Sequence, residues 1–403
     1  MNILMVNPNV TVGGAQKIML YLAKGLEERG HRVVIYTTAV DDSRLPAFAK
    51  TLTYIVDDRP ILRQGGELAN FTAIDNVAVL GSRLLRLRRG IRRAIRAHQI
   101  DLVNPHNPPA NWLCSFLGVP VVWSCHNNPM AFYRNLKPGY SALWPSKARL
   151  HHQILEAGYE GMDYVLIRYG ITAIVSLSGT IARRIQSVYG RDSEVITFAL
   201  SDEDGIQRGP AAPEDKFERM GRDGVTLLQV GQLAEDKRPR VSLDVLEAVR
   251  GRIPNVRLCF VGDGTLRPSL EEEVRRRRLE SLVSFLGYKN EQELADIYAS
   301  AHILLFPGAH QPLGIVPIEA ITKSVVPIVA ETSGVTEILR RHGLTTVAQP
   351  TAEAFAEQVC AVYARRAEVG RWLAQVRRSL EEELNYPRFL DRYEACFGRI
   401  VGR

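Results

Sequence analysis

The fold is decided by the stretch Phe306-Pro307-Gly308-Ala309-His310-Gln311-Pro312-Leu313-Gly314-Ile315-Val316-Pro317-Ile318-Glu319-Ala320. It continues an apolar run, 303–306, that has the length and composition of a buried strand. A turn rich in proline and glycine comes next, and a helix is predicted to begin near Gly314, with Pro317 in its first turn, where the missing N–H costs nothing. A strand, a glycine turn and a helix N-terminus aim free N–H groups and a positive dipole end at one point. The stretch therefore predicts an anion site.

Glu319 lies about one turn inside the predicted helix. At that depth its carboxylate can accept hydrogen bonds from the hydroxyl groups of a ligand whose phosphates lie at the helix start. A nucleotide sugar has this chemistry, because it carries a diphosphate next to a ribose. The stretch therefore predicts a nucleotide-sugar site.

The same stretch resembles the donor site of the retaining glycosyltransferases of family 4, which have the GT-B fold. In that family, two Glu residues separated by seven positions bracket a turn similar to Pro-Phe-Gly. Glu319 matches the second Glu, and Pro312-Leu313-Gly314 matches the turn. Gln311 stands where the first Glu is expected, so the resemblance departs from the family at that residue.

The bulk composition fits a two-domain protein. The chain has 403 residues, of which 46% are hydrophobic, enough for two cores. No window approaches about 18 consecutive apolar residues, and the first residues lack the basic region of a secretory signal. The five cysteines are scattered without metal-ligand spacing, which is typical of reduced thiols. We expect a cytoplasmic protein, with a peripheral position on the inner membrane face as an alternative.

The two halves of the chain repeat one pattern. In the first half, a strand over 3–6, a helix over 15–29 and a strand over 32–37 imply parallel pairing. The second half restarts with a strand over 225–230 and a helix over 240–250. The expected fold class is α/β, with two doubly wound Rossmann-like domains whose ligand crevices lie at the carboxyl ends of the strands. Further strands are expected at 101–104, 120–124, 173–176, 256–261, 283–287, 303–306 and 327–330.

The resemblance extends from Met1 to about Leu339 and implies the GT-B arrangement, in which two domains face each other across a cleft. By the resemblance, a terminal helix packs back on the first domain. The expected divisions are an acceptor-side domain over 1–200, a linker rich in Gly, Pro and charge over 201–224, a nucleotide-sugar-binding domain over 225–380, and the terminal helix within 381–403.

The loop Gly231–Lys237 resembles the diphosphate-binding loop of the family. In family members an Arg and, after four further residues, a Lys hold the diphosphate and stabilise the charge of the leaving group. Lys237 matches the Lys, whereas Gln232 stands at the Arg and brings no charge. Removal of a donor at such a site costs several kcal/mol. Arg238 and Arg240 are candidates to replace the missing cation, with an orientation toward solvent as the alternative.

Gln232 and Gln311 are two departures from the family at one expected subsite. Together they remove a positive and a negative group, so local neutrality is preserved. Two interpretations stay open: the site is adjusted to a different donor, or it no longer turns over.

Several residues of the first half are expected at a crevice edge. By the resemblance, His126 hydrogen-bonds the donor sugar near the reacting carbon, and a purely structural histidine is the alternative. His106 and Asn127 are expected on the acceptor side. Gly13 and Gly14 follow a strand and open a helix, where glycine lets the backbone approach a phosphate or sugar, although a tight turn has the same pattern.

The expected site therefore combines residues of the first half with residues of the second half. In the second half, Tyr288 follows Gly287, where family members place backbone against the nucleotide base. A further turn, 262–264, resembles the family's Gly-Asp-Gly turn. Catalysis is assigned to His126, Lys237 and Gln311, and donor binding to Gly13, Gly14, Gln232, Lys237, Tyr288, Leu313, Gly314 and Glu319.

Seven arginines fall between Arg83 and Arg96, with no acidic residue from Asn76 to Ile100. A basic amphipathic helix of this kind can lie on an anionic membrane surface or meet an anionic acceptor, and a solvated face on a core-packed helix is the alternative. Nucleic acid is not expected, because aromatic residues are few here and no known nucleic-acid-binding module is present. Neither an Asp-x-Asp motif after a strand nor paired Cys/His spacing is present, so no metal and no cofactor besides the nucleotide sugar is expected.

The sequence thus predicts a retaining, metal-independent hexosyltransferase. It would move a sugar from a nucleotide diphosphate, with UDP-sugar as our choice, to a hydroxyl acceptor that is anionic or lipid-linked, in the synthesis of a glycan, glycolipid or glycosylated metabolite. The implied mechanism has no enzyme nucleophile: the leaving diphosphate, held by Lys237 and the helix at Gly314, accepts the acceptor's proton. Two alternatives stay open, a catalytically silent GT-B protein that binds nucleotide or glycan, and a nucleotide-sugar epimerase of the same fold.

Overall fold

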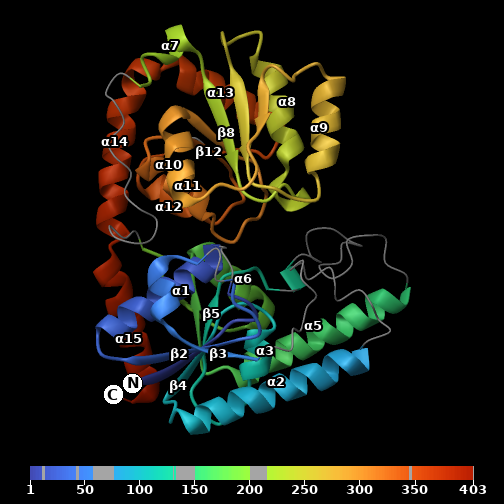
Figure 1. Cartoon of the computed structure of the whole chain (residues 1–403), viewed down its shortest axis with the longest axis vertical. Coiled ribbons are helices and arrows are strands. Elements are labelled where there is room, and N and C mark those ends of the chain that lie inside the picture. The colour runs from blue at the N-terminus through green and yellow to red at the C-terminus, as the bar shows by residue number, and fades with distance from the viewer. Residues whose placement is uncertain are drawn as a thin grey trace. The chain divides into compact units, whose positions relative to one another are not determined.

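The chain folds into two compact units. Unit 1 comprises Met1–Ala199 and Tyr386–Arg403, and unit 2 comprises Leu200–Asn385, so the chain leaves unit 1 once and returns to it at its end (Figure 1). The computed structural model describes residues 1–10, 14–41, 45–57, 77–129, 131–132, 150–199, 216–344 and 347–402, without the side chains of 77–83, 150–156, Glu291 and Val347.

Unit 1 is built on parallel strands. Its first sheet has the order β3-β2-β1-β4, and a parallel bridge between Val103 and Val121 continues it into the sheet β5-β6-β7. Ile3, Leu4 and Met5 are fully buried, as expected for strands covered on both faces. The strands are β1 (Asn2–Val6), β2 (Arg32–Thr37), β3 (Thr53–Val56), β4 (Leu102–Pro105), β5 (Val122–Cys125), β6 (Ala173–Ser176) and β7 (Glu194–Val195).

Helices cover this sheet. Leu87, Ile91 and Ala94 of α2 are buried in the core of unit 1, at the spacing of one helix face. Ser178 caps α6 by accepting a hydrogen bond from the Ile181 N–H, at 3.3 Å. The helices of unit 1 are α1 (Gly14–Glu28), the 3-10 helix η1 (Ala47–Thr51), α2 (Val77–Ala97), α3 (Ala110–Cys114), α5 (Leu150–Gly170), α6 (Gly179–Tyr189) and α15 (Tyr386–Val401).

The terminal helix α15 packs on α1. A side chain added at Gly25 would lie 2.5 Å from the end of the Leu390 side chain, so a larger residue there would displace Leu390. The Tyr386 hydroxyl donates to the Tyr21 carbonyl at 2.6 Å. The last residues of the chain therefore complete the unit that its first residues begin.

Unit 2 has one parallel sheet with the order β10-β9-β8-β11-β12-β13. The strand order reverses between β8 and β11, which pair at Leu227 with Ile303 and at Leu228 with Leu304. Ligands of open α/β sheets bind at the carboxyl ends of the strands at such a reversal. The strands are β8 (Thr226–Val230), β9 (Arg257–Val261), β10 (Val283–Phe285), β11 (Ile303–Phe306), β12 (Val326–Ala330) and β13 (Val347–Ala348).

The helices of unit 2 lie on both faces of this sheet, with α8 and α9 on one side and α10, α11 and α12 on the other (Figure 1). Asn290 and Glu293 form a capping box at the start of α10. The helices are α7 (Met220–Asp223), the 3-10 helix η4 (Glu235–Lys237), α8 (Pro239–Val249), α9 (Arg267–Arg276), α10 (Glu291–Ser300), α11 (Ile315–Thr322), α12 (Val335–Arg341), α13 (Ala352–Ala364) and α14 (Arg366–Glu383).

The observed division differs in detail from the expected domain boundaries. Residues 201–215 of the expected linker lie outside the described residues, and the described remainder belongs to unit 2, where Lys216, Phe217 and Met220 are buried. The expected border at 380 falls inside α14, because the apolar spacing of that helix continues to Leu380 and the helix ends at Glu383.

Candidate active site

The loops that follow β8 and β11 meet at the strand reversal of unit 2. The β8 loop begins at Gly231, whose φ of 136° is a conformation that favours glycine. Lys237 and Gln311, one from each loop, are in direct contact: the Lys237 ammonium donates to the Gln311 side-chain carbonyl. These two residues, assigned to the site from sequence, are therefore brought together by the fold.

Asp236 completes this contact, and sequence reasoning did not assign it to the site. Its carboxylate lies 3.1 Å from the Lys237 Nζ, and its main-chain carbonyl accepts from the Gln311 side-chain amide at 3.1 Å. Gln311 is buried, whereas the Lys237 side chain is 31% exposed. An acidic residue next to the matched lysine was the signal that could have identified Asp236. We call Asp236, Lys237 and Gln311 the lysine cluster.

The glycines of the 262–264 turn hold the β8 loop in place. A side chain at Gly262 would lie 2.1 Å from the Gly231 carbonyl, and one at Gly264 would lie 2.4 Å from the Leu233 carbonyl. The Leu233 N–H also donates to the Asp263 carbonyl at 3.0 Å. Two loops can approach this closely only where one of them carries no side chain.

The β11 loop is tied to the start of α12. The N–H groups of Gly334 and Val335 donate to the carbonyls of Gln311 and Leu313, at 2.8 and 2.7 Å. Leu313 is buried, and Gly314, with φ 96°, immediately precedes α11. The expected helix start near Gly314 is thus observed, and the turn that aims it is fixed by main-chain hydrogen bonds.

Glu319 is the fifth residue of α11 and is half-buried. Its carboxylate lies 3.5 Å from the hydroxyl of Tyr298, which belongs to α10. Burial, and then the neighbouring carboxylate, raise the pKa of Tyr298 well above its usual value, so this hydroxyl stays a hydrogen-bond donor. Tyr288 is 53% exposed and follows Gly287, whose φ is 68°.

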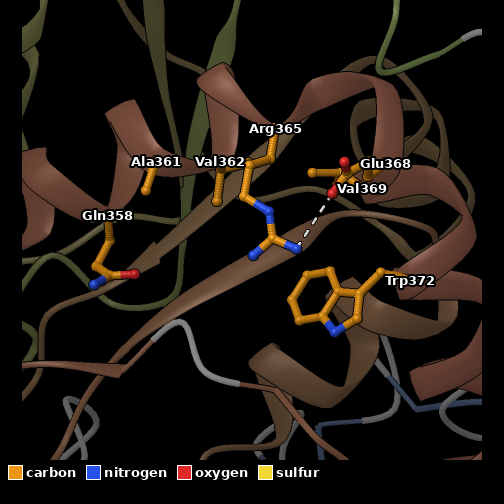
Figure 2. Close-up of a pocket in the computed structure, with 7 residues that line it drawn as sticks. All are labelled: Gln358, Ala361, Val362, Arg365, Glu368, Val369 and Trp372. Carbon is orange, nitrogen blue, oxygen red and sulfur yellow. Dashed lines mark hydrogen bonds and ion pairs between the residues drawn. The ribbon is translucent and has the colours of Figure 1, made fainter.

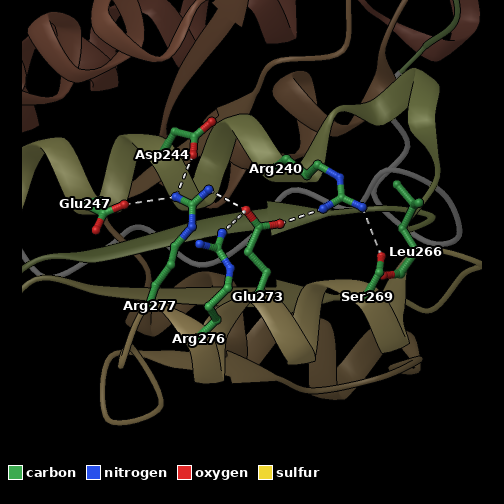
Figure 3. A network of polar contacts seen from close by, with 8 residues as sticks. All are labelled: Arg240, Asp244, Glu247, Leu266, Ser269, Glu273, Arg276 and Arg277. Atoms are coloured by element: carbon green, nitrogen blue, oxygen red, sulfur yellow. Dashed lines mark hydrogen bonds and ion pairs between the residues drawn. The ribbon is translucent and has the colours of Figure 1, made fainter.

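Arg238 and Arg240, the candidates to replace the cation that is missing at Gln232, each contact another group. The Gln232 side chain is exposed and makes no hydrogen bond to the residues that the structure describes. Arg238 donates to the Pro350 carbonyl at 2.6 Å. Arg240 pairs with Glu273 at 2.6 Å, within a network that joins α8 to α9 (Figure 3). Without a donor bound, each arginine thus contacts another group, and a role for either in place of the missing cation stays a prediction.

In unit 1, His106 and His126 form a buried pair at the ends of β4 and β5. His106 Nδ1 lies 2.7 Å from His126 Nε2, and the rings stack at 11° with their centroids 5.0 Å apart. The outer nitrogen of each ring, His106 Nε2 and His126 Nδ1, is buried and has no hydrogen-bond partner among the described residues. Burial lowers the pKa of His126 to about 3, and burial followed by the charge of His126 lowers that of His106. Both rings are neutral near pH 7, with one donating to the other.

His106 was expected to shape the acceptor side, but it is fully buried behind His126. The end of a strand predicts the sheet edge at which a residue lies, not how deeply its side chain is covered. A chain of amides lies beside this pair: Asn127 donates to Asn107 at 3.1 Å, and Asn107 donates to Asn7 at 3.0 Å. Gly14 is the exposed first residue of α1, and Gly13 lies outside the described residues.

A surface hollow lies elsewhere in unit 2, between α13 and α14 (Figure 2). Arg365 reaches across it to Glu368, at 3.4 Å, near the indole of Trp372. It contains none of the residues assigned to the site. Among the residues that the structure describes, no three His, Cys, Asp or Glu side chains gather so as to hold a metal ion, and no helix has the length and apolarity needed to cross a membrane.

Solved structures share this architecture. WaaG, a glycosyltransferase involved in lipopolysaccharide biosynthesis, matches with a TM-score of 0.73 at 17% identity, over 100% of both chains. HepE from Anabaena, solved with UDP and glucose, matches with a TM-score of 0.72 at 15% identity, over 99% of this chain and 100% of that one. The fold is therefore GT-B, with two Rossmann-like parallel α/β domains.

Sequence comparison then identifies the family. The model "Glycosyltransferase Family 4" matches residues 12–198, and the model "Glycosyl transferases group 1" matches residues 213–375. A glycogen synthase of Mycobacterium tuberculosis is 24% identical over 353 residues, which cover 84% of this chain and 80% of that protein. The chain belongs to the family 4 glycosyltransferases, retaining enzymes that use nucleotide-sugar donors.

Proposed function

We propose that the chain is a metal-independent hexosyltransferase that moves a sugar, with retention, from a UDP-sugar to a hydroxyl acceptor. The observation that carries the proposal is the lysine cluster, which holds one cation at the strand reversal of unit 2. The same β11 loop leads through Gly314 into the N-terminus of α11, which favours anions. The choice of UDP is supported by HepE, which was solved with UDP and glucose.

In the proposed mechanism no side chain attacks the sugar. Lys237 and the N–H groups at the start of α11 hold the diphosphate, and Gln311 holds Lys237 in position. As the bond from the sugar to the diphosphate breaks, the acceptor oxygen bonds to the same face, and its proton passes to the departing diphosphate. Lys237 stabilises the negative charge that develops there. We further propose that His126 contacts the transferred sugar and that Gln232 and Tyr288 contact the donor. Asn127 is proposed to contact the acceptor.

The acceptor is proposed to be anionic or lipid-linked. A peripheral contact with a membrane through Arg83–Arg96 would bring the enzyme to such an acceptor. A cytoplasmic location is supported by the five cysteines, all of which are free thiols.

The test is a panel of UDP-, GDP-, ADP- and TDP-sugars, scored for binding and for release of the nucleoside diphosphate. The parent protein should release the nucleotide from one donor class. Lys237→Ala should slow that release about 100-fold or more with an unchanged melting temperature, because a group that stabilises the leaving charge contributes little to folding. Lys289→Ala is the matched control, since Lys289, just before α10, pairs with Glu293 and with no other acid among the described residues. A folded Lys237→Ala variant that keeps its rate would contradict the proposal.

A second candidate is a catalytically silent GT-B protein that binds nucleotide or glycan. It is favoured by the carboxylate of Asp236, 3.1 Å from Lys237, which competes with a diphosphate for the same cation. Nucleotide binding without release from any donor would select this candidate. Conversion of the donor to its epimer without release would select an epimerase instead.

A further inference from the structure

One face of α2 is lined with arginines. Arg86, Arg89, Arg92, Arg93 and Arg96 are all exposed, and they lie opposite the residues of α2 that enter the core. None of the five forms an ion pair with an acid among the described residues. We call these five residues the basic face. If α2 were only a core-packed helix with a solvated face, the burial of its other side would be explained. The concentration of unpaired positive charge on the basic face would not be explained.

Exposed apolar side chains gather near the basic face. Of the nine large hydrophobic side chains that are exposed in the described part of the chain, six belong to α2, α5 and the residue Phe116 that follows α3. Met162, Val165 and Tyr169 are spaced by three and four positions, which places them on one side of α5. We call five of them the apolar belt: Leu85, Phe116, Met162, Val165 and Tyr169. Tyr164, two positions from Met162, lies on another side of α5.

Phe116 joins the two helices. The Arg88 guanidinium, from α2, donates to the carbonyls of Leu113 and Phe116, both at 2.9 Å. The Phe116 N–H donates to the carbonyl of Gly170, the last residue of α5, at 3.0 Å. Figure 1 shows α2 and α5 extending in the same direction from unit 1. The basic face and the apolar belt are thus parts of one connected surface.

The two acids of α5 whose side chains the structure describes are withdrawn from this surface. Glu160 and Asp163 are buried, and Asp163 accepts from the Trp112 indole at 2.6 Å and from the Tyr189 hydroxyl at 2.5 Å. The side chains described on α5 therefore add no exposed negative charge beside the arginines. Positive charge with adjoining apolar side chains is the composition of a surface that binds an anionic interface.

We propose that the basic face and the apolar belt together dock on an anionic lipid bilayer, the arginines on lipid phosphates and the belt in the headgroup region. This inference rests on the membrane contact through Arg83–Arg96 proposed above, and it adds the apolar belt as a second part of that contact. Two other occupants fit less well. A second copy would set two basic faces against each other in a two-fold contact, and a polyphosphate chain would leave Leu85, Met162 and Val165 without apolar partners.

The charge half is tested with the full chain and vesicles of phosphatidylcholine, with and without phosphatidylglycerol, in the absence of any donor. The parent should bind only the anionic vesicles. Arg86→Gln, Arg89→Gln and Arg93→Gln together should weaken that binding about 100-fold. The matched control replaces Arg252, Arg275 and Arg278 by Gln, which removes the same charge from exposed positions of unit 2. Equal weakening by the control would show non-specific attraction and overturn the proposal.

The apolar half is tested with Val165→Ser and Tyr169→Ser, which change exposed residues and should leave the melting temperature unchanged. They should weaken binding roughly tenfold and abolish the part that persists at high salt, because apolar burial is not screened. Leu286→Ser, an exposed apolar position in unit 2, is the control. If the two variants leave vesicle binding intact, the belt does not insert; if they convert a dimer to a monomer instead, the face belongs to a second copy. Since no donor is present, loss of sugar transfer cannot be mistaken for loss of docking.

Discussion

At the scale of single residues, the lysine cluster changes what the two glutamines mean. The carboxylate beside Lys237 comes from Asp236 in the same loop, not from position 311, and Gln311 binds both of these residues. Gln232 makes no hydrogen bond to this cluster. Local neutrality was expected because positions 232 and 311 both lack a charge. In the structure, the positive charge of Lys237 is instead balanced by the negative charge of Asp236, its neighbour in the chain.

Asp236→Asn tests this arrangement. The carboxylate competes with a diphosphate for Lys237, but it is 58% exposed, so its removal should raise the affinity for UDP only about two- to fivefold. Calorimetric titration measures the change, with Glu235→Gln in the same loop as the control. The effects of Asp236→Asn and Gln311→Glu on UDP affinity should be non-additive, because the two residues touch. The effects of Gln232→Arg and Gln311→Glu on UDP affinity should be additive. Weaker UDP binding by Asp236→Asn would contradict the competing role.

Lys216 is a second residue whose position matters. It is buried, and its ammonium donates to the carbonyls of Tyr298 and Ser324, at 3.2 and 3.0 Å. Tyr298 lies in the last turn of α10, and Ser324 follows α11, so one cation holds the carboxyl ends of both helices. Burial lowers the pKa of Lys216 to about 8.

This lowered pKa predicts a pH dependence of stability. The unfolded lysine titrates near 10.4, so between about pH 8 and pH 10 the unfolded chain binds the proton that the folded chain has released. The stability contributed by this group is therefore present above about pH 10 and is lost as pH falls toward 8. Relative to Lys216→Met, the free energy of unfolding of the parent should rise by up to about 3 kcal/mol across this window. Denaturant unfolding at each pH measures it, and parallel curves for the two proteins would contradict the assignment.

At the scale of elements, α8 and α9 are joined by the network of Figure 3. Glu273, 12% exposed, accepts from Arg240 at 2.6 Å and from Arg277, which also donates to Asp244 at 2.6 Å. Burial alone would raise the pKa of Glu273. The hydrogen bond and the charge of Arg277, followed by those of Arg240, outweigh burial and lower this pKa. The network therefore clamps the two helices that cover one face of the unit 2 sheet.

Glu273→Gln should reduce the free energy of unfolding of unit 2 by about 1 to 3 kcal/mol, the usual effect of losing hydrogen bonds to charged groups. The folded pKa is lowered, so this stabilisation is present above the unfolded pKa of about 4.3 and is lost as pH falls through the folded value. The gap between parent and variant should thus close in acid. Glu272→Gln, an exposed neighbour, is the control for thermal unfolding. A gap that stays constant down to acid pH would mean that the network contributes nothing through charge.

Elements whose signals are local were predictable from sequence. The strand over 303–306, the turn at Gly314 and the helix that carries Glu319 follow from an apolar run, a glycine and a proline within one short stretch. The partner of Arg240 was not predictable, because Glu273 lies on another helix and no local pattern links the two. The stacking of His106 on His126 escaped for the same reason: adjacent strand ends are predictable, but the depth of each side chain depends on the packing around it.

At the scale of the whole molecule, the chain begins and ends in unit 1. Phe397 and Tyr393 of α15 are fully buried there, and the Tyr393 hydroxyl lies 3.2 Å from the Ser124 hydroxyl near the end of β5. On the other side of the border, Leu373 and Leu380 of α14 are buried in unit 2. Helices that follow one another in sequence thus belong to different cores.

Phe397→Ala should therefore destabilise unit 1 by about 3 to 5 kcal/mol and leave unit 2 intact. Leu373→Ala is the reciprocal variant, with an expected loss of about 2 to 5 kcal/mol confined to unit 2. Hydrogen exchange followed by peptide mass spectrometry reports each unit separately. Faster exchange in β1, β2 and β5 for the first variant, and in β8 and β11 for the second, is the expected pattern. Faster exchange in both units for either variant would show that they unfold as one.

The return of α15 to unit 1 has a consequence for synthesis on the ribosome. The strands of unit 1 are translated before unit 2, but the helix that covers Gly25 of α1 is translated after it. Unit 2 has its complete sequence before unit 1 does, although unit 1 begins earlier. Until α15 has been translated, the nascent chain exposes the side of α1 that α15 covers, and a chain interrupted after Asn385 has one finished core and one open one.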